Sequence, residues 1–304
     1  MNWYHALLAP GLFANPSVQE AAVVGALVAA VCGPVGMFTV MRSQSFAGHA
    51  LADIASTGGS GALLLGLSPL LGFVVFGVTA SGTMEMVGTH RRQGRDLVTG
   101  IVLGASLGLS ALFLYLTATS QTTTGAAVTI LFGSIFAVTS STVWFAVGVG
   151  GAALVLLGLL YRPLLVSSVN PELAAAQGIP VRLVGLAHMV ALALAVALSA
   201  LTIGAILSTA LLIGPAAAAL YLTRSPGRAM VMASGVSLVV TWIGVALAYD
   251  SYDWLPSHQG WPVSFFVVLL VLATYALARV AVWRRVGPRR RKAVPAGAGW
   301  RGER

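Results

Sequence analysis

Long apolar runs recur along almost the whole chain, and they limit its fold more than any other feature. A helix needs roughly 20 apolar residues to cross the hydrocarbon core of a bilayer. Only 8% of the residues are charged, against about a quarter in soluble domains. The sequence therefore predicts an all-α integral membrane protein, a polytopic bundle of about 8 or 9 transmembrane helices, within one domain over residues 1–304. We place nine spans at residues 20–41, 47–67, 69–88, 97–117, 141–160, 183–201, 203–222, 229–249 and 262–283.

Basic residues gather on one side of these predicted spans. That side holds Arg42, the loop 90–95, Arg162 with Arg182, the turn 224–228 and the basic tail 284–304. The connections on the other side, QTTTGA and YDSYDWLPSHQG, contain no lysine or arginine. Because cytoplasmic loops are enriched in basic residues, we expect a multi-pass protein of the cell membrane with a cytoplasmic C-terminus. The tail is attracted to anionic lipid, and a nucleic-acid partner is not expected.

Two segments do not fit the pattern of a membrane span. Residues 1–19 begin with an aromatic, amphipathic stretch, WYHALLAPGLF, which is typical of a segment at the membrane interface. Residues 129–138, TILFGSIFAV, are too short to cross a bilayer and precede threonine and serine. We expect this second piece to be interfacial or re-entrant, because such backbone is tolerated only where protein covers it.

Familiar catalytic motifs are absent from the sequence. The single lysine, Lys292, has no GxxxxGK[ST] pattern around it, so the chain lacks a P-loop for ATP. HExxH, GxSxG and CxxC patterns are also missing. We therefore expect a protein that is not an enzyme and binds no cofactor of its own.

The cytoplasmic loop at residues 161–182 contains the pattern of a complete small helix. Asn170 is a good N-cap, Pro171 fits the first helical position, and Glu172 suits the positive end of the helix dipole. Gly178 followed by Pro180 ends the run. The pattern itself fits a docking element and a surface connector equally well.

Three stretches resemble the ABC-3 family, the membrane subunits of ABC importers for zinc and manganese. They are MRSQSFAGHALAD, YRPLL with NPELAAAQGIPV, and IGAILSTALLIGPAAAALYLTRS, within residues 20–283. The resemblance implies a type II importer-like permease with a second copy of the chain, cytoplasmic ATPases that bind ATP, and an extracytoplasmic metal-binding protein. It also implies that the helix at 170–178 docks on the ATPase, through Asn170, Pro171, Glu172, Leu173, Ala174, Gln177 and Gly178.

Two ionisable residues, His49 and Asp53, interrupt the second predicted span. Residues four apart share one face of a helix, and a charged group at the bilayer centre costs about 2.5–3.5 kcal/mol. Imidazole nitrogen and carboxylate oxygen suit Zn²⁺ and Mn²⁺ as cargo, and a second copy supplies the same pair again. The family usually shows Gly-Asp-x-x-x-His here, whereas this chain has the two ligand types exchanged.

The metal interpretation of this pair has an alternative. Arg42 lies only two turns earlier, so the pair also fits a solvated or ion-paired helix end near the cytoplasmic interface. The following STGGSG favours metal handling, because we expect a glycine-rich break in the span to line a cavity. Imidazole favours zinc over manganese in the usual affinity order, so zinc is the first expectation and manganese the second.

Other polar residues provide weaker candidates. Asp250, Asp253 and His258 form an outer cluster that fits either metal entry or an ordinary solvated loop. The lone His188 fits a packed, hydrogen-bonded histidine better than a ligand. A secondary transporter driven by an ion gradient, an ABC permease for iron or iron chelates, and a purely structural subunit remain the alternative functions.

Overall fold

The computed structural model of the chain describes residues 15–87, 92–120, 125–133, 135–254 and 260–286. Within these ranges the secondary structure is helical throughout, with no strand. The α-helices are α2 (Pro16–Met41), α3 (Ser45–Leu64), α4 (Pro69–Val87), α5 (Arg92–Ser120), α6 (Ala126–Phe132), α7 (Ser140–Val169), α8 (Pro171–Ala176), α9 (Val181–Ile203), α10 (Ser208–Leu222), α11 (Pro226–Asp250) and α12 (Val263–Val286). The short 3₁₀ turns η2 (Ile135–Ala137) and η3 (Ser251–Asp253) complete the described secondary structure.

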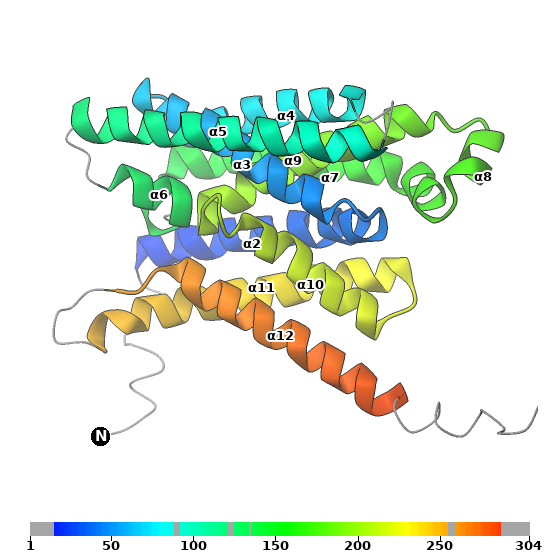
Figure 1. The fold of residues 1–304 in the computed structure, drawn as a ribbon. Coiled ribbons are helices and arrows are strands. Elements are labelled where there is room, and N and C mark those ends of the chain that lie inside the picture. The colour runs from blue at the N-terminus through cyan, green and yellow to red at the C-terminus, as the bar shows by residue number, and fades with distance from the viewer. Residues whose placement is uncertain (1–14, 88–91, 121–124, 134, 255–259, 287–304) are drawn as a thin grey trace, which may run out of the picture.

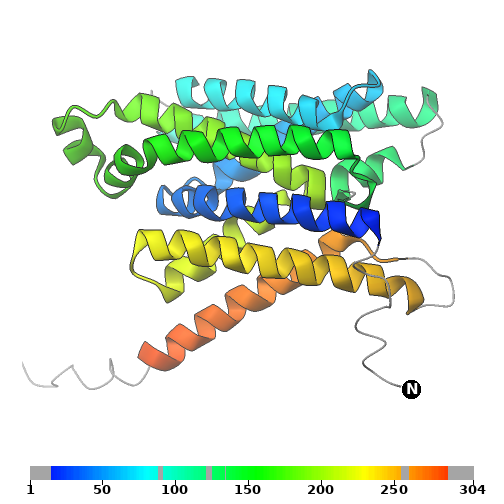
Figure 2. The same cartoon turned by 180° about the vertical axis from the view of Figure 1, so that it is seen from behind.

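Nine helices of the described chain overlap the nine predicted spans. Six of them, α2, α5, α7, α9, α11 and α12, are long and apolar enough to cross a membrane, whereas α4 and α10 are apolar but shorter. The helices run side by side in one layered bundle, and α12 diverges from it towards its C-terminal end (Figures 1 and 2). The predicted all-α membrane fold is therefore confirmed.

Helices α2 and α9 form the centre of the bundle. Helix α2 packs against α7, α9, α10 and α11, and α9 also packs against α3 and α4. Their buried side chains include Phe38 on α2 and Leu198 on α9. One end of the bundle carries α8 and the α2–α3 turn, while α6 lies at the other end (Figure 1). Helix α3, which carries His49 and Asp53, packs against α9 of this centre and against α4 and α5.

Several predicted segment boundaries were wrong, because the helices extend beyond them. Helix α7 continues to Val169, so the first half of the expected loop 161–182 is helical and the connection to α9 is shorter. The expected interfacial segment 1–19 ends in residues that belong to α2, and its first 14 residues lie outside the described chain. Likewise, α12 includes the beginning of the tail 284–304, up to Val286. Apolar periodicity locates a helix well, but it does not mark where polar residues extend that helix beyond the membrane.

The segment after α5 is not a span, as its length predicts. Helix α6 has 7 residues, about 10 Å of helical rise, and it ends at Gly133, whose φ is 77°. In the turn between α9 and α10, the N–H of Ala205 donates a hydrogen bond to the carbonyl of Ile130 in α6, at 3.1 Å. Gly204 in this turn has φ 84° and approaches α6 too closely for any side chain. The predicted span 203–222 therefore starts only at Ser208, because the preceding residues bind α6 instead of continuing a helix.

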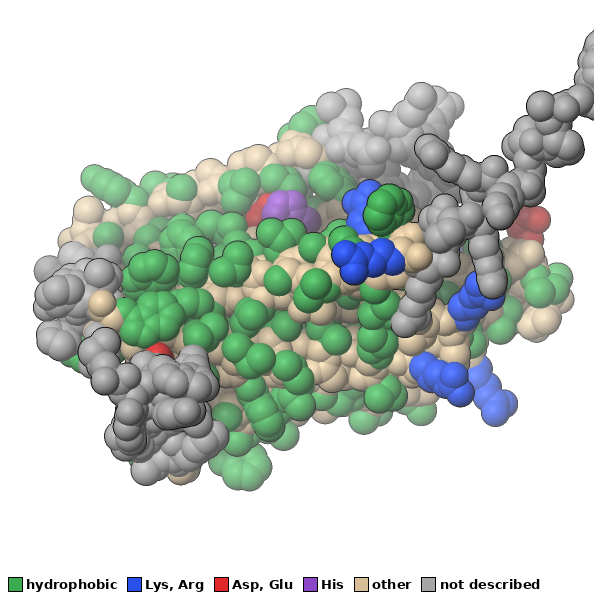
Figure 3. All heavy atoms as spheres, turned by 90° about the horizontal axis from the view of Figure 1, so that it is seen from below, with side chains coloured by type: hydrophobic (Ala, Val, Ile, Leu, Met, Phe, Trp, Pro, Cys, Tyr) green, Lys and Arg blue, Asp and Glu red, His purple; other side chains and the backbone are tan. Residues whose placement is uncertain are grey.

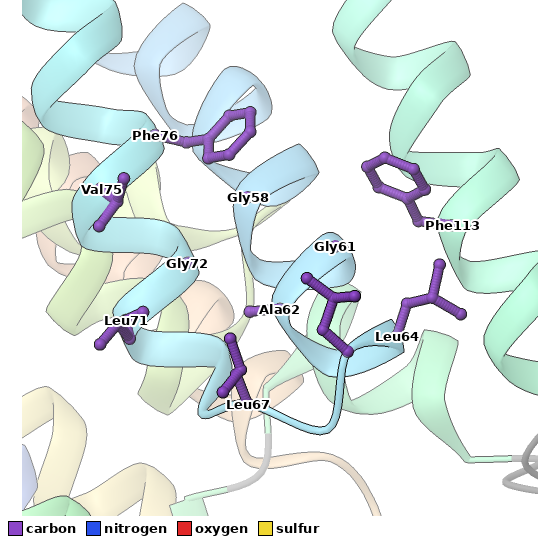
Figure 4. Close-up of a pocket in the computed structure, with 11 residues that line it drawn as sticks. Gly58, Gly61, Ala62, Leu64, Leu67, Leu71, Gly72, Val75, Phe76 and Phe113 are labelled. Carbon is purple, nitrogen blue, oxygen red and sulfur yellow. The ribbon is translucent and has the colours of Figure 1, made fainter.

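The STGGSG stretch does not break a helix, which corrects the expectation of a glycine-rich interruption there. Helix α3 runs through it without a gap, and its glycines bring α3 against α4 instead. A Cβ at Gly72 of α4 would overlap the carbonyl of Gly58, and a Cβ at Gly59 would lie 2.6 Å from the Phe73 ring. Small residues allow helices to approach closely in lipid, where packing drives association. Beside this crossing lies an apolar groove of about 320 Å³, which Phe76 and Phe113 help to line (Figure 4).

We expect Gly72→Ala to destabilise the protein, because the new methyl group meets backbone, which cannot rotate away. Overpacking of this kind costs about 1–3 kcal/mol. The measurement is the thermal unfolding midpoint in detergent, with the monodisperse fraction in gel filtration as a second readout. Gly104→Ala is the control, since a Cβ at Gly104 on exposed α5 meets no atom within 4 Å. Equal midpoints for both variants would show that the α3–α4 contact does not require glycine.

Candidate metal site

The two residues predicted to handle metal lie together on α3. His49 Nε2 is 3.6 Å from Asp53 Oδ2, so the imidazole and the carboxylate form an ion pair whenever the ring is protonated. The His49 side chain is 47% exposed, whereas that of Asp53 is 9% exposed. The imidazole is therefore half exposed, whereas the carboxylate is almost buried in the bundle.

A tight turn holds this pair close to the end of the bundle. Two backbone hydrogen bonds end helix α2. The N–H of Gln44 donates to the carbonyl of Thr39 at 2.9 Å, and the N–H of Ser43 donates to the carbonyl of Val40 at 3.0 Å. Ser43 adopts φ 55°, a conformation that costs a non-glycine residue about 1–3 kcal/mol. Helix α3 begins directly after this turn, so His49 lies one turn into α3. Figure 3 shows basic side chains at one end of this face and a histidine beside an acidic side chain further in.

The pair by itself provides only part of a metal site. One imidazole and one carboxylate are suitable ligands for Zn²⁺ and Mn²⁺, but a closed zinc site takes four ligands. No group of three or more His, Cys, Asp or Glu residues is placed to hold a metal ion in the part of the chain that the structure describes. The remaining ligands must therefore come from water, from another chain or from outside the described ranges.

Hydroxyl groups continue the same face of α3 beyond Asp53, and the sequence analysis missed them. Ser56 donates to the carbonyl of Asp53 at 2.6 Å and contacts Ser110 of α5 at 3.3 Å. Ser60 also contacts Ser110, at 3.2 Å, and Thr57 donates to the carbonyl of Ser106 at 2.8 Å. These bonds join α3 to α5 along a polar seam. The spacing of Ser56 and Ser60 from Asp53 was the available signal, because helical neighbours recur every three or four residues.

The capped helix predicted in the connecting loop is present as α8. Asn170 accepts a hydrogen bond from the N–H of Leu173 at 3.0 Å, Pro171 is the first helical residue, and Gly178 has φ 77°. Helix α8 packs against α7 and α9. Ala174 is buried against them, while Glu172, Leu173, Gln177 and Gly178 are exposed. The local structure is confirmed, and its docking role stays a prediction.

The structure describes only part of the outer cluster of Asp250, Asp253 and His258. Asp250, at the end of α11, is buried and accepts a hydrogen bond from Trp254 Nε1 at 3.0 Å. Asp253 lies in η3, but its side chain and His258 fall outside the described part of the chain. A metal-entry role for Asp250, Asp253 and His258 therefore stays a prediction, with Asp250 already serving as a tryptophan partner.

Comparison with known proteins gives consistent matches. Residues 14–277 match the model of the ABC 3 transport family. The chain is 30% identical over 233 residues to the manganese import system permease protein ScaB of Streptococcus parasanguinis, covering 77% of this chain and 82% of that protein. It is 28% identical over 235 residues to the high-affinity zinc uptake system membrane protein ZnuB of Haemophilus influenzae, covering 77% and 88%. The solved structure of PsaBC from Streptococcus pneumoniae in complex with Fab is similar with a TM-score of 0.76 and 27% identity, over 88% of this chain and 92% of that one.

Proposed function

Because the chain belongs to the ABC 3 transport family, we propose that it is the transmembrane permease subunit of an ABC importer that moves a divalent transition-metal ion into the cytoplasm. The observation that carries this proposal is the His49–Asp53 pair, with its 3.6 Å separation, inside an otherwise apolar helical bundle. Ionisable residues are rare in membrane spans and mark ion pathways. A structural subunit has no need of such a pair.

The metal binds, in this proposal, between two copies of the chain. One copy offers an imidazole nitrogen and a carboxylate oxygen, and a second copy related by a two-fold axis offers the same two residues. Two nitrogens and two oxygens complete a four-ligand site, which suits zinc. Carboxylate oxygen also suits manganese, and relatives carry the names of both metals. The cargo is therefore zinc or manganese, and a direct uptake comparison decides between them.

The partners follow from the two ends of the bundle. ATP hydrolysis takes place on a separate cytoplasmic chain, because the sequence has no P-loop. That ATPase docks on α8, whose exposed Leu173 and Glu172 lie beside the ends of α7 and α9. Arg162, Arg182, Arg224 and Arg228 belong to the same end, which we therefore assign to the cytoplasm, together with the C-terminus. An extracytoplasmic metal-binding protein delivers the ion at the opposite end.

Reconstitution in lipid vesicles with the cognate ATPase and metal-binding protein tests this function. We expect saturable, ATP-dependent uptake of Zn²⁺ or Mn²⁺ when each metal, and iron, is supplied separately. The control complex carries an ATPase whose P-loop lysine is replaced by alanine, and it should show no uptake. Accumulation of metal that follows a proton or sodium gradient without ATP would indicate a secondary transporter instead. Preferential uptake of an iron chelate would indicate a permease of another specificity.

A further inference from the structure

A second, partly buried polar cluster lies at the α8 end of the bundle, separate from the His49–Asp53 pair. It consists of Arg42 in the α2–α3 turn, Glu85 on α4, Ser167 on α7 and His188 on α9. Its four members come from four different parts of the chain. We refer to these residues as the Arg42 cluster.

Arg42 is the centre of this cluster. Its Nη1 donates to Ser167 Oγ at 3.1 Å. Gly185 on α9 has no Cβ, and two charged groups lie close to the point that a Cβ would occupy. Arg42 Nη2 is 3.5 Å from that point, and Glu85 Oε1 is 2.7 Å from it. The guanidinium and the carboxylate therefore share the space that the missing side chain leaves free. Burial lowers the pKa of Arg42, and the Glu85 carboxylate opposes that shift, so the two groups interact as opposite charges.

His188, the fourth member of the cluster, does not compete with Glu85 for the positive charge of Arg42. His188 is completely buried, and neither of its ring nitrogens has a hydrogen-bond partner. Its ring meets the edge of Phe38, with 6.4 Å between the ring centroids. Low-polarity surroundings strengthen electrostatic attraction. The attraction between Arg42 and Glu85 therefore has more effect here than it would at a solvated helix end, and the fixed cation makes the cluster unsuitable for binding a second metal ion.

The cluster joins the helix that carries the metal pair to the two helices that carry α8. Ser167 lies just before the end of α7, Gly185 lies one turn into α9, and α8 connects these two helices. Arg42 lies in the turn that precedes α3, and His49 lies one helical turn into α3. Arg42 therefore lies between the two helices that flank α8 and the start of α3.

We propose that Arg42 is a positioning residue that transmits movement of α8 to the His49–Asp53 pair, through Ser167 and through Glu85 over Gly185. This proposal rests on the proposed function, because it assigns to the Arg42 cluster the coupling between ATPase and metal site. Coupling between two sites requires an element that both of them bias. In this proposal Arg42 is such an element, because it bonds Ser167 of α7, lies beside Gly185 of α9 and caps α2 just before the turn into α3.

The test measures metal ions transported per ATP hydrolysed in vesicles that contain the whole complex. We expect Arg42→Ala to bind metal and ATPase normally while the transport ratio falls about tenfold, within the usual range of coupling between sites. Arg42→Lys should recover part of the ratio, because it retains the charge but not the planar fork. Gly185→Ala should lower the ratio while the protein still folds, since its methyl group displaces only the flexible end of Glu85.

Arg182→Ala is the matched control, because Arg182 is exposed near the start of α9, the helix that also carries Gly185. It should retain the transport ratio of the unchanged complex. If the unchanged complex transports metal and both Arg42→Ala and Gly185→Ala keep its ratio, the coupling role is wrong and the proposed function stands. If Arg42→Ala does not fold, Arg42→Lys and Gly185→Ala decide, and wild-type ratios in both overturn the coupling role. Absence of ATP-dependent uptake in the unchanged complex contradicts the proposed function itself.

Discussion

We expect His49→Ala and Asp53→Ala each to reduce metal uptake by more than about a hundredfold while the proposed permease still assembles with its ATPase. Each substitution removes one of the two proposed ligands, the described residues place no group of three or more such ligands together, and in the proposed dimer the loss occurs twice. Even residues that only support a metal ligand cost about 10–100-fold in affinity or activity when they are changed. Uptake of labelled Zn²⁺ and Mn²⁺ by reconstituted vesicles gives the measurement.

Assembly with the ATPase separates this effect from misfolding. His49 is half exposed, so its removal leaves no buried gap, and co-purification of the ATPase should not change. Leu65→Ala is the control, since Leu65 is exposed and caps the far end of α3, away from the pair. Uptake at the unchanged rate in both variants would mean that the pair is only an ion-paired helix end. Equal loss of uptake and of ATPase binding would indicate a structural role.

The helices could be predicted from the sequence because their signals are local. Apolar runs located the long helices, and Asn170, Pro171 and Gly178 marked both ends of α8 before its structure was known. The glycines of STGGSG misled the prediction, because glycine serves both helix breaks and close helix contacts. Only the position of Gly72 on another helix distinguishes the two, and a single sequence does not contain that information.

The polar sites show the same division between local and distant information. His49 and Asp53 could be paired in advance because four residues bring side chains together on any helix. The contact of Ser60 with Ser110 crosses 50 residues, and that of Arg42 with Ser167 crosses 125. Such contacts depend on how the helices pack, so hydropathy and spacing do not predict them. The His49–Asp53 pair was visible in the sequence, while the groups that connect it to its surroundings were not.

Helix α8 offers a small target at the end of the bundle that we assign to the cytoplasm, and its disruption should stop transport. Leu173 is 50% exposed although it is apolar, and it lies on a helix that Asn170 caps and Ala174 anchors. An exposed apolar residue on a short fixed helix is suited to enter a hydrophobic pocket of a partner. A carboxylate at this position would lose its hydration on docking without gaining a partner.

We therefore expect Leu173→Glu to weaken ATPase binding by about 2 kcal/mol or more, roughly thirtyfold, and to abolish uptake. Binding of detergent-purified permease to immobilised ATPase gives the affinity, and equilibrium dialysis with Zn²⁺ or Mn²⁺ gives metal binding. Leu173→Met retains the apolar volume and should bind the ATPase normally. Metal binding should survive in Leu173→Glu, because His49 and Asp53 lie on α3, away from α8. Unchanged ATPase affinity in Leu173→Glu would show that α8 is only a surface connector.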